Sequence, residues 1–266
     1  MSLAVVVKGP EGIVLGTDSR ATVDLPSTGG SVPPMTFDNA TKMLSFSKPH
    51  SYVGAVTYGA AAIGLRTAHS YLTELELSLE KDDRLTVREY AQRLSDFFMA
   101  HWKDVMPKDY QGQNMGFIVG GYGHDAAYGD VYVFEIPRDP SPQARHAGDH
   151  SFGMSWRGQI QIANRLLNGC DPATIDIVRQ TLNLDQGQVE RLSEELKSRL
   201  RFPIPFPILP LQDCVDLTVF LIRSTIAAQR FAATLRGVGG PVEVATITRT
   251  EGLQYVQKRR IHVEAD

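Results

Sequence analysis

MSLAVVVKGPEGIVLGTDSRAT, residues 1–22, decides how this 266-residue chain is expected to fold. Residues 3–8 and 13–18 are rich in Val, Ile and Leu, which is typical of strands. Gly9-Pro10-Glu11-Gly12 between them indicates a tight turn. We therefore expect an antiparallel hairpin with arms of similar length. Such a hairpin places Asp18 beside the start of the first strand, next to Ser2.

The composition is that of an ordinary globular protein, with 42% hydrophobic residues, 21% charged residues and a formal net charge of −3. These values favour neither nucleic acid nor a membrane as a partner, because there is no basic excess and no apolar run of about 20 residues. Cys170 and Cys214 are far apart and indicate reduced thiols in a cytoplasmic protein. The histidines lack metal-ligand spacing, and the glycine-rich residues 120–123 lack the Lys-Ser/Thr of a phosphate loop. We expect no metal and no cofactor.

Strand-like and helix-like patterns alternate in blocks along the chain. This order favours an α+β fold of two sheets packed face to face with helices outside, in one domain over residues 1–266. After the first hairpin we expect a loop over 25–38, a hairpin of 41–46 with 51–57, a helix ending near Glu80, a helix capped by Thr86, strands over 115–121 and 130–136, helices over about 156–168 and 214–234, and a strand over 242–249.

Residues 170–213 are predicted to be an insertion. Their first part is polar and helical over 189–200, and their second part contains four prolines within residues 203–210. Proline at this density excludes both a helix and a central strand. The apolar, proline-rich segment 202–210 either lies on another surface, such as a neighbouring subunit, or packs onto its own domain.

Ser2, Asp18, Arg20 and Lys42 form the most informative group of polar residues. Each has a structural explanation: Asp18 as a turn cap, Arg20 in a surface ion pair and Lys42 as a solvated strand end. If Met1 is removed, however, Ser2 carries an α-amine beside its own hydroxyl. An α-amine with a pKa of about 7.7–8.0 is a suitable general base for that hydroxyl. The Lys42 ammonium would favour the deprotonated groups, and Asp18 would orient Lys42.

Residues 12–22, GIVLGTDSRAT, closely resemble the signature of proteasome β-type subunits, which are N-terminal-nucleophile (Ntn) hydrolases. The family's spacing, counted back from Asp18, reaches Ser2, where those subunits carry a threonine nucleophile. Residues 41–43 resemble the segment that holds the catalytic lysine, which assigns that role to Lys42. The resemblance implies Ser2, Asp18, Arg20 and Lys42 as catalytic residues.

Weaker similarities follow along the chain. Residues 57–59 resemble the turn whose backbone N–H forms the oxyanion hole, which implies Gly59 and Tyr58 there and Thr22, in the first motif, as substrate-binding. Residues 152–155 resemble the "GSGS" turn before a helix and add Ser155. Residues 238–242 resemble the late "SGG" turn.

The resemblance implies a four-layer αββα sandwich, copies of the chain assembled in rings around the sites, and a peptide or unfolded protein as substrate, with an ATPase unfoldase as a further partner to test. The chain departs from the family's pattern in several places. The serine of the "GSGS" turn falls either on Met154 or, displaced by one position, on Ser155. The nucleophile is serine instead of threonine. The family's second Asp and Ser fall on Leu235 and Val238, whose apolar side chains cannot form the hydrogen bonds of those polar residues. The function we expect is peptide-bond hydrolysis by Ser2; the alternatives are an inactive proteasome-like scaffold and an Ntn amidase acting on small molecules.

Overall fold

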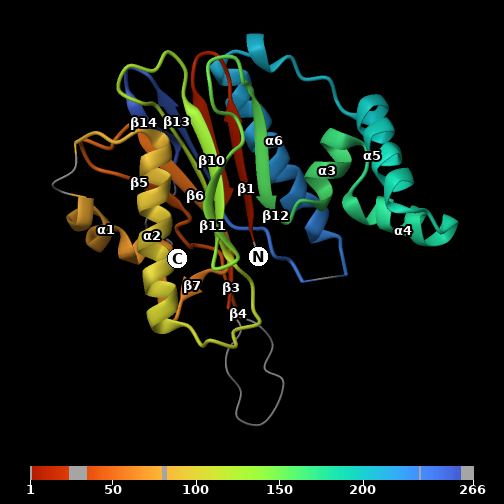
Figure 1. The fold of residues 1–266 in the computed structure, drawn as a ribbon, viewed down its shortest axis with the longest axis horizontal. Coiled ribbons are helices and arrows are strands. Elements are labelled where there is room, and N and C mark those ends of the chain that lie inside the picture. The colour runs from red at the N-terminus through yellow and green to blue at the C-terminus, as the bar shows by residue number, and fades with distance from the viewer. Residues whose placement is uncertain (1, 24–34, 80–82, 234, 259–266) are drawn as a thin grey trace, which may run out of the picture.

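The hairpin predicted from residues 3–18 lies in the middle of a five-stranded sheet (Figure 1). The computed structural model describes residues 2–23, 35–79, 83–233 and 235–258. In the hairpin, β1 (Leu3–Lys8) and β2 (Ile13–Asp18) are antiparallel, with Lys8 opposite Ile13 and Ala4 opposite Thr17. The sheet has the order β12-β1-β2-β13-β14, and its other strands are β12 (Gly153–Gly158), β13 (Val242–Thr248) and β14 (Gly252–Gln257).

A second five-stranded antiparallel sheet has the order β11-β10-β9-β6-β5. It contains the predicted hairpin of residues 41–57 and the two predicted strands near 115 and 130. Its strands are β5 (Met43–Ser45), β6 (Val53–Gly59), β9 (Met115–Gly121), β10 (Asp130–Ile136) and β11 (Asp139–Ala144). The sequence analysis missed β11, whose two prolines are tolerated because it is an edge strand.

The two sheets bury a shared apolar layer. In β1, Ala4 and Val6 join a cluster with Val56 of β6 and Ile118 of β9, both from the other sheet. The alternate residues Leu3, Val5 and Val7 join a different cluster on the opposite face of the first sheet. Successive side chains of a strand point to opposite faces, so β1 is apolar throughout because both of its faces are buried.

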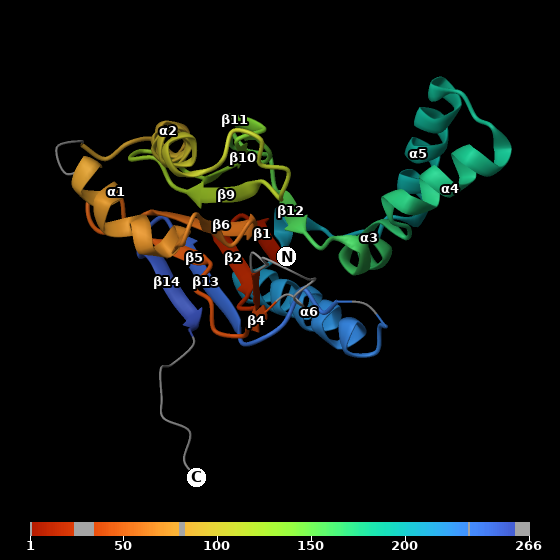
Figure 2. The same ribbon diagram turned by 90° about the horizontal axis from the view of Figure 1, so that it is seen from below.

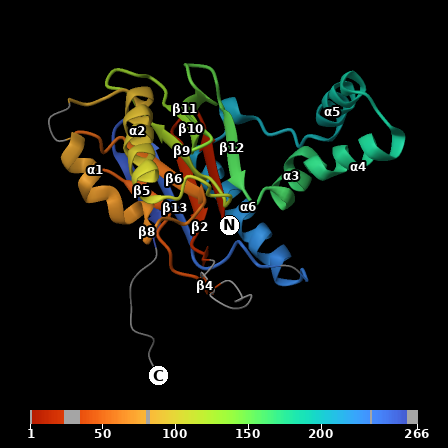
Figure 3. The same cartoon turned by 60° about the horizontal axis from the view of Figure 1, so that its bottom comes forward.

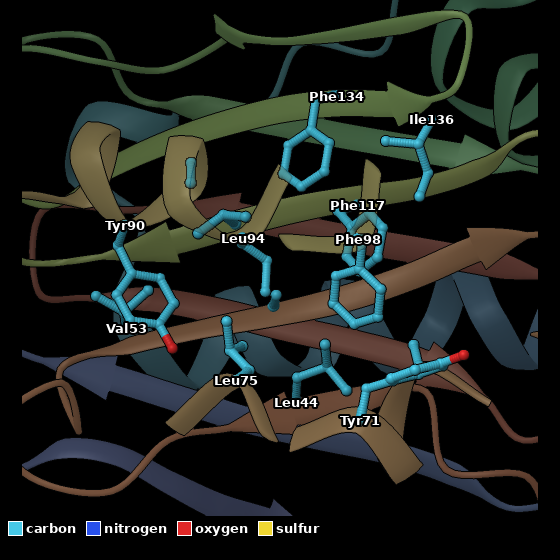
Figure 4. Packing of buried hydrophobic residues seen from close by; sticks show 14 of the residues in the cluster. Leu44, Val53, Tyr71, Leu75, Tyr90, Leu94, Phe98, Phe117, Phe134 and Ile136 are labelled. Carbon is cyan, nitrogen blue, oxygen red and sulfur yellow. The ribbon is translucent and has the colours of Figure 1, made fainter. Parts of the chain in front are cut away.

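Helices cover the outer face of each sheet. Helices α1 (Leu72–Leu79) and α2 (Val87–Val105) pack against the second sheet. The side chains that they bury lie against Phe117 and Phe134 of this sheet (Figure 4); they include Leu75, Tyr90, Leu94 and Phe98. Against the first sheet packs α6 (Leu211–Arg230), which contributes Cys214, Leu221 and Ile222. The structure is therefore α+β with antiparallel sheets.

The insertion forms a helical hairpin that projects from the body of the molecule (Figure 2). It follows α3 (Gln161–Asn168) and consists of α4 (Pro172–Leu182) and α5 (Gln186–Leu200), neither of which has a buried residue. The proline-rich segment returns to the body through the 3-10 turn η2 (Phe206–Ile208). Phe206 is buried in the cluster under α6, whereas Phe202 stays exposed. This segment therefore packs onto its own domain.

The short elements complete the described chain. They are β3 (Ala21–Val23), which pairs with β4 (Met35–Phe37), β7 (Ala62–Ile63), which pairs with β8 (Arg66–Thr67), and the 3-10 turn η1 (Ala68–Tyr71). None of the described helices is long and apolar enough to cross a membrane.

Three sequence predictions need correction. The helix expected over 156–168 begins only at Gln161, because residues 153–158 pair with β1 as β12. The helix expected over 214–234 runs from Leu211 to Arg230. Residues 35–37 of the expected loop form β4, while its residues 25–34, like Glu80, lie outside the described residues.

The predicted cap of α2 gives a stability test. The Thr86 hydroxyl accepts a hydrogen bond from the Glu89 N–H, and the Glu89 carboxylate accepts one from the Thr86 N–H, so both form a capping box. We expect Thr86→Ala to lower the free energy of unfolding by about 1 kcal/mol, measured by urea denaturation. Thr67→Ala is the control, because Thr67 precedes η1 without a side-chain cap; an equal loss in both variants would contradict this role.

Candidate active site

The Asp18 carboxylate is the centre of the candidate site. It is fully buried at the end of β2 and holds four donors. Oδ1 accepts from Leu3 N at 3.0 Å and from Lys42 Nζ at 2.8 Å. Oδ2 accepts from Arg20 N at 3.1 Å and from Gly239 N at 2.9 Å. A buried carboxylate needs such donors, so Asp18 ties four segments of the chain together.

Lys42 is the only cation that forms an ion pair with Asp18 in the described chain, and its side chain is 7% exposed. It precedes β5, and its carbonyl accepts hydrogen bonds from the N–H and the hydroxyl of Thr57 in β6. Burial lowers the pKa of Lys42 below its ordinary value, and the Asp18 carboxylate opposes this shift. The ammonium shares Oδ1 with Leu3 N, so it lies beside the peptide group that joins Ser2 to Leu3.

Ser2 is buried, and its backbone carbonyl accepts a hydrogen bond from the backbone of a neighbouring segment. Gln159 N donates to Ser2 O at 2.7 Å, at the turn between β12 and α3. Gly158, opposite Leu3 in the ladder, has a φ of +93°, and a Cβ there would lie 2.0 Å from Ser2 O. Figure 3 shows this turn beside the start of β1 and near α6. The backbone on either side of Ser2 is thus fixed by Asp18 and by Gln159.

Two glutamines, which the sequence analysis missed, connect this turn to the turn after α6. Gln229 Nε2 donates to Gln159 Oε1, and Gln229 Oε1 accepts from Val238 N at 2.9 Å. The next residue, Gly239, donates to Asp18. No motif marks the two glutamines, because they are 70 residues apart in the sequence.

Arg20 contributes its backbone N–H to the site, and its side chain points elsewhere. The guanidinium binds Asp38 with Nε–Oδ1 at 2.5 Å and Nη2–Oδ2 at 2.7 Å, and Nη1 donates to Arg236 O at 3.2 Å. Hydrogen bonding to Arg20 holds the pKa of Asp38 below its usual range. Arg20 therefore joins the segments around residues 20, 38 and 236 and is a supporting residue.

Two cavities meet at Gly59, which ends β6 with a φ of +80°. A cavity of about 450 Å³ contains Ser2 and Tyr58 in its wall. A cavity of about 500 Å³ contains Thr22, whose hydroxyl is buried without a hydrogen-bond partner among the described residues. Gly59 and Tyr58 therefore line the same cavity as Ser2, and Thr22 lines the adjoining cavity that also contains Gly59.

Ser155 does not join this group. It lies within β12 opposite Val6, three residues before the end of the strand. The turn predicted at residues 152–155 is wrong; the turn before α3 consists of residues 159–160 and places Gln159 next to Ser2. Of the two apolar positions noted in the sequence, Leu235 is exposed and lines the Thr22 cavity, and Val238 is buried under α6.

Comparison with protein-family models gives no match to this chain, and a search of curated proteins gives none either. Among the described residues, no three His, Cys, Asp or Glu side chains are grouped so as to hold a metal ion.

The Asp18–Lys42 pair predicts a non-additive loss of stability. Lys42→Met leaves a buried carboxylate without its cation, which we expect to cost about 3–5 kcal/mol in the free energy of unfolding. In Asp18→Asn/Lys42→Met neither charge remains, so the double variant should be more stable than Lys42→Met. Urea denaturation of the single and double variants measures the coupling. Arg66→Met is the control, because the Arg66–Glu74 pair is exposed to solvent and its loss should change stability little.

Gly158 offers a test of how closely Ser2 is held. Gly148 has nearly the same φ, +90°, but a Cβ there meets nothing within 4 Å. The backbone conformation alone should cost each alanine variant about 1–2 kcal/mol. Gly158→Ala should cost roughly 1–3 kcal/mol more, because its Cβ overlaps Ser2 O. Faster hydrogen exchange of the Gln159 amide in Gly158→Ala alone would confirm the displacement of Ser2; equal effects in both variants would contradict it.

Proposed function

We propose that this protein hydrolyses peptide bonds with an N-terminal serine nucleophile, Ser2, which removal of Met1 exposes. One observation carries the proposal: the buried Asp18–Lys42 ion pair is bound to the backbone N–H that directly follows Ser2. This arrangement puts an ammonium group beside a serine that has its own α-amine. The resemblance of residues 12–22 to proteasome β-type subunits supports the same chemistry.

In the proposed mechanism the Ser2 hydroxyl attacks the peptide carbonyl while the Ser2 α-amine takes its proton. The same amine then gives the proton to the departing amine of the substrate. Water attacks the resulting ester, releases the acid product and restores the hydroxyl. Backbone N–H groups around Gly59 stabilise the negative oxygen of each tetrahedral intermediate.

Lys42 acts electrostatically in this mechanism. A positive charge nearby favours the neutral form of the α-amine and the developing negative charge on the serine oxygen. Asp18 fixes the position of the ammonium through a 2.8 Å contact, and Thr57 fixes the backbone of Lys42. Burial keeps both charges away from water, which strengthens their effect.

We also propose that the fold is the four-layer αββα sandwich of the Ntn hydrolases. The helices α1 and α2 on one sheet, the apolar layer between the sheets and α6 on the other sheet support this assignment. An oligomer that encloses the sites belongs to the same proposal. The exposed Ile177, Leu182 and Phe202 on the projecting insertion are consistent with it, because assembly would bury such side chains.

The proposal is tested first by the intact mass of the purified protein and by reaction with a peptide epoxyketone. This probe needs a hydroxyl and a free α-amine on the same residue. We expect chains that begin at Ser2 and one adduct per chain on Ser2. A retained Met1, or an assembled protein without an adduct, would refute the hydrolase and favour an inactive scaffold.

Two substitutions sharpen the test. Ser2→Ala should abolish the adduct, and Lys42→Ala should slow its formation about 10²-fold or more, the range for loss of one group that stabilises the transition state electrostatically. Lys103→Ala is the matched control, because Lys103 is an exposed lysine of α2. Unchanged labelling of a folded Lys42→Ala protein would remove Lys42 from the mechanism.

A further inference from the structure

The 450 Å³ cavity beside Ser2 has a polar wall that the proposed mechanism does not use. Its polar side chains come from β6, the segment before β9, β10, β12, the turn before α3 and the first residue of α3. They are Tyr58, Gln113, Asn114, Glu135, Arg157, Gln159 and Gln161. Glu135 and Arg157 are the charged side chains among the described residues that line it, so the lining as a whole is close to neutral.

The Glu135 carboxylate is positioned by a hydrogen bond from Tyr58, which lies two strands away in the same sheet. Tyr58 of β6 and Glu135 of β10 both lie opposite Gly116 of β9, so the three residues are in register on adjacent strands. Gly116 has no side chain, and a Cβ there would lie 2.2 Å from the Tyr58 ring. The ring therefore lies over Gly116, and its hydroxyl donates to Glu135 Oε1 at 3.0 Å.

A second donor binds the other carboxylate oxygen. Asn114 Nδ2 lies 3.4 Å from Glu135 Oε2. Burial raises the pKa of Tyr58, and the Glu135 carboxylate adds to this shift, so Tyr58 remains a neutral donor. A carboxylate accepts about four hydrogen bonds, and the described residues donate two to Glu135. Glu135 therefore has free acceptor capacity toward the cavity.

Arg157 supplies donors in the same cavity. Its Nη1 donates to Trp156 O at 2.9 Å, and Arg157 lines the same cavity as Tyr58 and Glu135. A guanidinium has five N–H donors. The cavity thus presents an acceptor, Glu135, and a donor, Arg157.

We infer that this cavity binds the leaving-group side of the substrate and selects a residue whose side chain ends in a carboxamide. A carboxamide donates through its NH2 to Glu135 and accepts through its oxygen from Arg157. An aliphatic side chain would leave both groups without partners. An ammonium could pair with Glu135 but would leave Arg157 unpaired beside a like charge, and a carboxylate could pair with Arg157 but would leave Glu135 unpaired beside a like charge.

The assignment to the leaving-group side rests on the proposed function. In that mechanism the scissile bond lies at Ser2, so a peptide that passes Gly59 extends into one cavity on each side. The resemblance assigns Thr22 to substrate binding, and Thr22 lines the other cavity. The Glu135 cavity is therefore left for the departing part of the substrate.

Calorimetric titration with amino-acid amides tests the selectivity without any turnover. We expect glutamine amide to bind about 10-fold or more tightly than leucine, lysine or glutamate amide, because buried polar groups discriminate strongly against ligands that leave them unpaired. Tightest binding of any of the other three amides, or no binding of glutamine amide, would overturn the inference.

Variants connect the preference to the carboxylate. In Glu135→Gln, which keeps an acceptor for Tyr58, the preference for glutamine amide over glutamate amide should fall several-fold. In Glu135→Leu the preference over leucine amide should disappear. Glu76→Gln is the matched control, because Glu76 is also half-buried and accepts a hydrogen bond, from Ser47 N, in a different cavity. An unchanged preference in folded Glu135→Leu would exclude Glu135 from the pocket.

Turnover then separates this inference from the proposed function. Peptides with Gln directly after the scissile bond should be cleaved with a lower KM than those with Leu, and Glu135→Leu should remove that difference while the epoxyketone still labels Ser2. Selective binding of glutamine amide by a protein that the epoxyketone does not label would leave the pocket intact and refute the hydrolase. Labelling of Ser2 without any selectivity would refute the pocket alone.

Discussion

The structure depends on one buried carboxylate. Asp18 is removed from water at the end of β2, and a carboxylate in that position is stable only when donors surround it. Its four donors among the described residues belong to the start of β1, the second residue after β2, the segment before β5 and the turn after α6. Because each of these segments must satisfy the same group, their relative positions are fixed together. The candidate site is therefore a consequence of how the polar interior is satisfied.

The part of this arrangement that lies within a short stretch of sequence could be predicted. The hairpin of residues 3–18 has a strand pattern, a turn and a second strand in 16 consecutive positions, and its register places Asp18 next to Leu3. The involvement of Lys42 was expected from the resemblance, and its 2.8 Å contact with Asp18 agrees. The cap at Thr86 has an equally local signal, a threonine followed by glutamate three residues later.

The rest depends on contacts between distant segments. Residues 153–158 have no clear strand pattern, and they form β12 because β1 offers them an edge. Once β12 ends at Gly158, Gln159 rather than Ser155 reaches Ser2. The Gln159–Gln229 contact and the Tyr58–Glu135 contact each join elements that the fold brings together. Polar pairs of this kind have no spacing rule, so sequence reasoning could not find them.

The hydrogen bonds of Gln159 and Gln229 also bear on whether the apolar residues Leu235 and Val238 are compatible with an active site. In the sequence, apolar residues at these positions count against activity, because the family places polar side chains there. In the structure Val238 turns its side chain into the apolar cluster under α6 and gives its N–H to Gln229. Gln229 in turn binds Gln159, whose backbone binds Ser2. Amide groups of α6 and of the β12–α3 turn are therefore linked to Ser2 by hydrogen bonds, although Leu235 and Val238 are apolar.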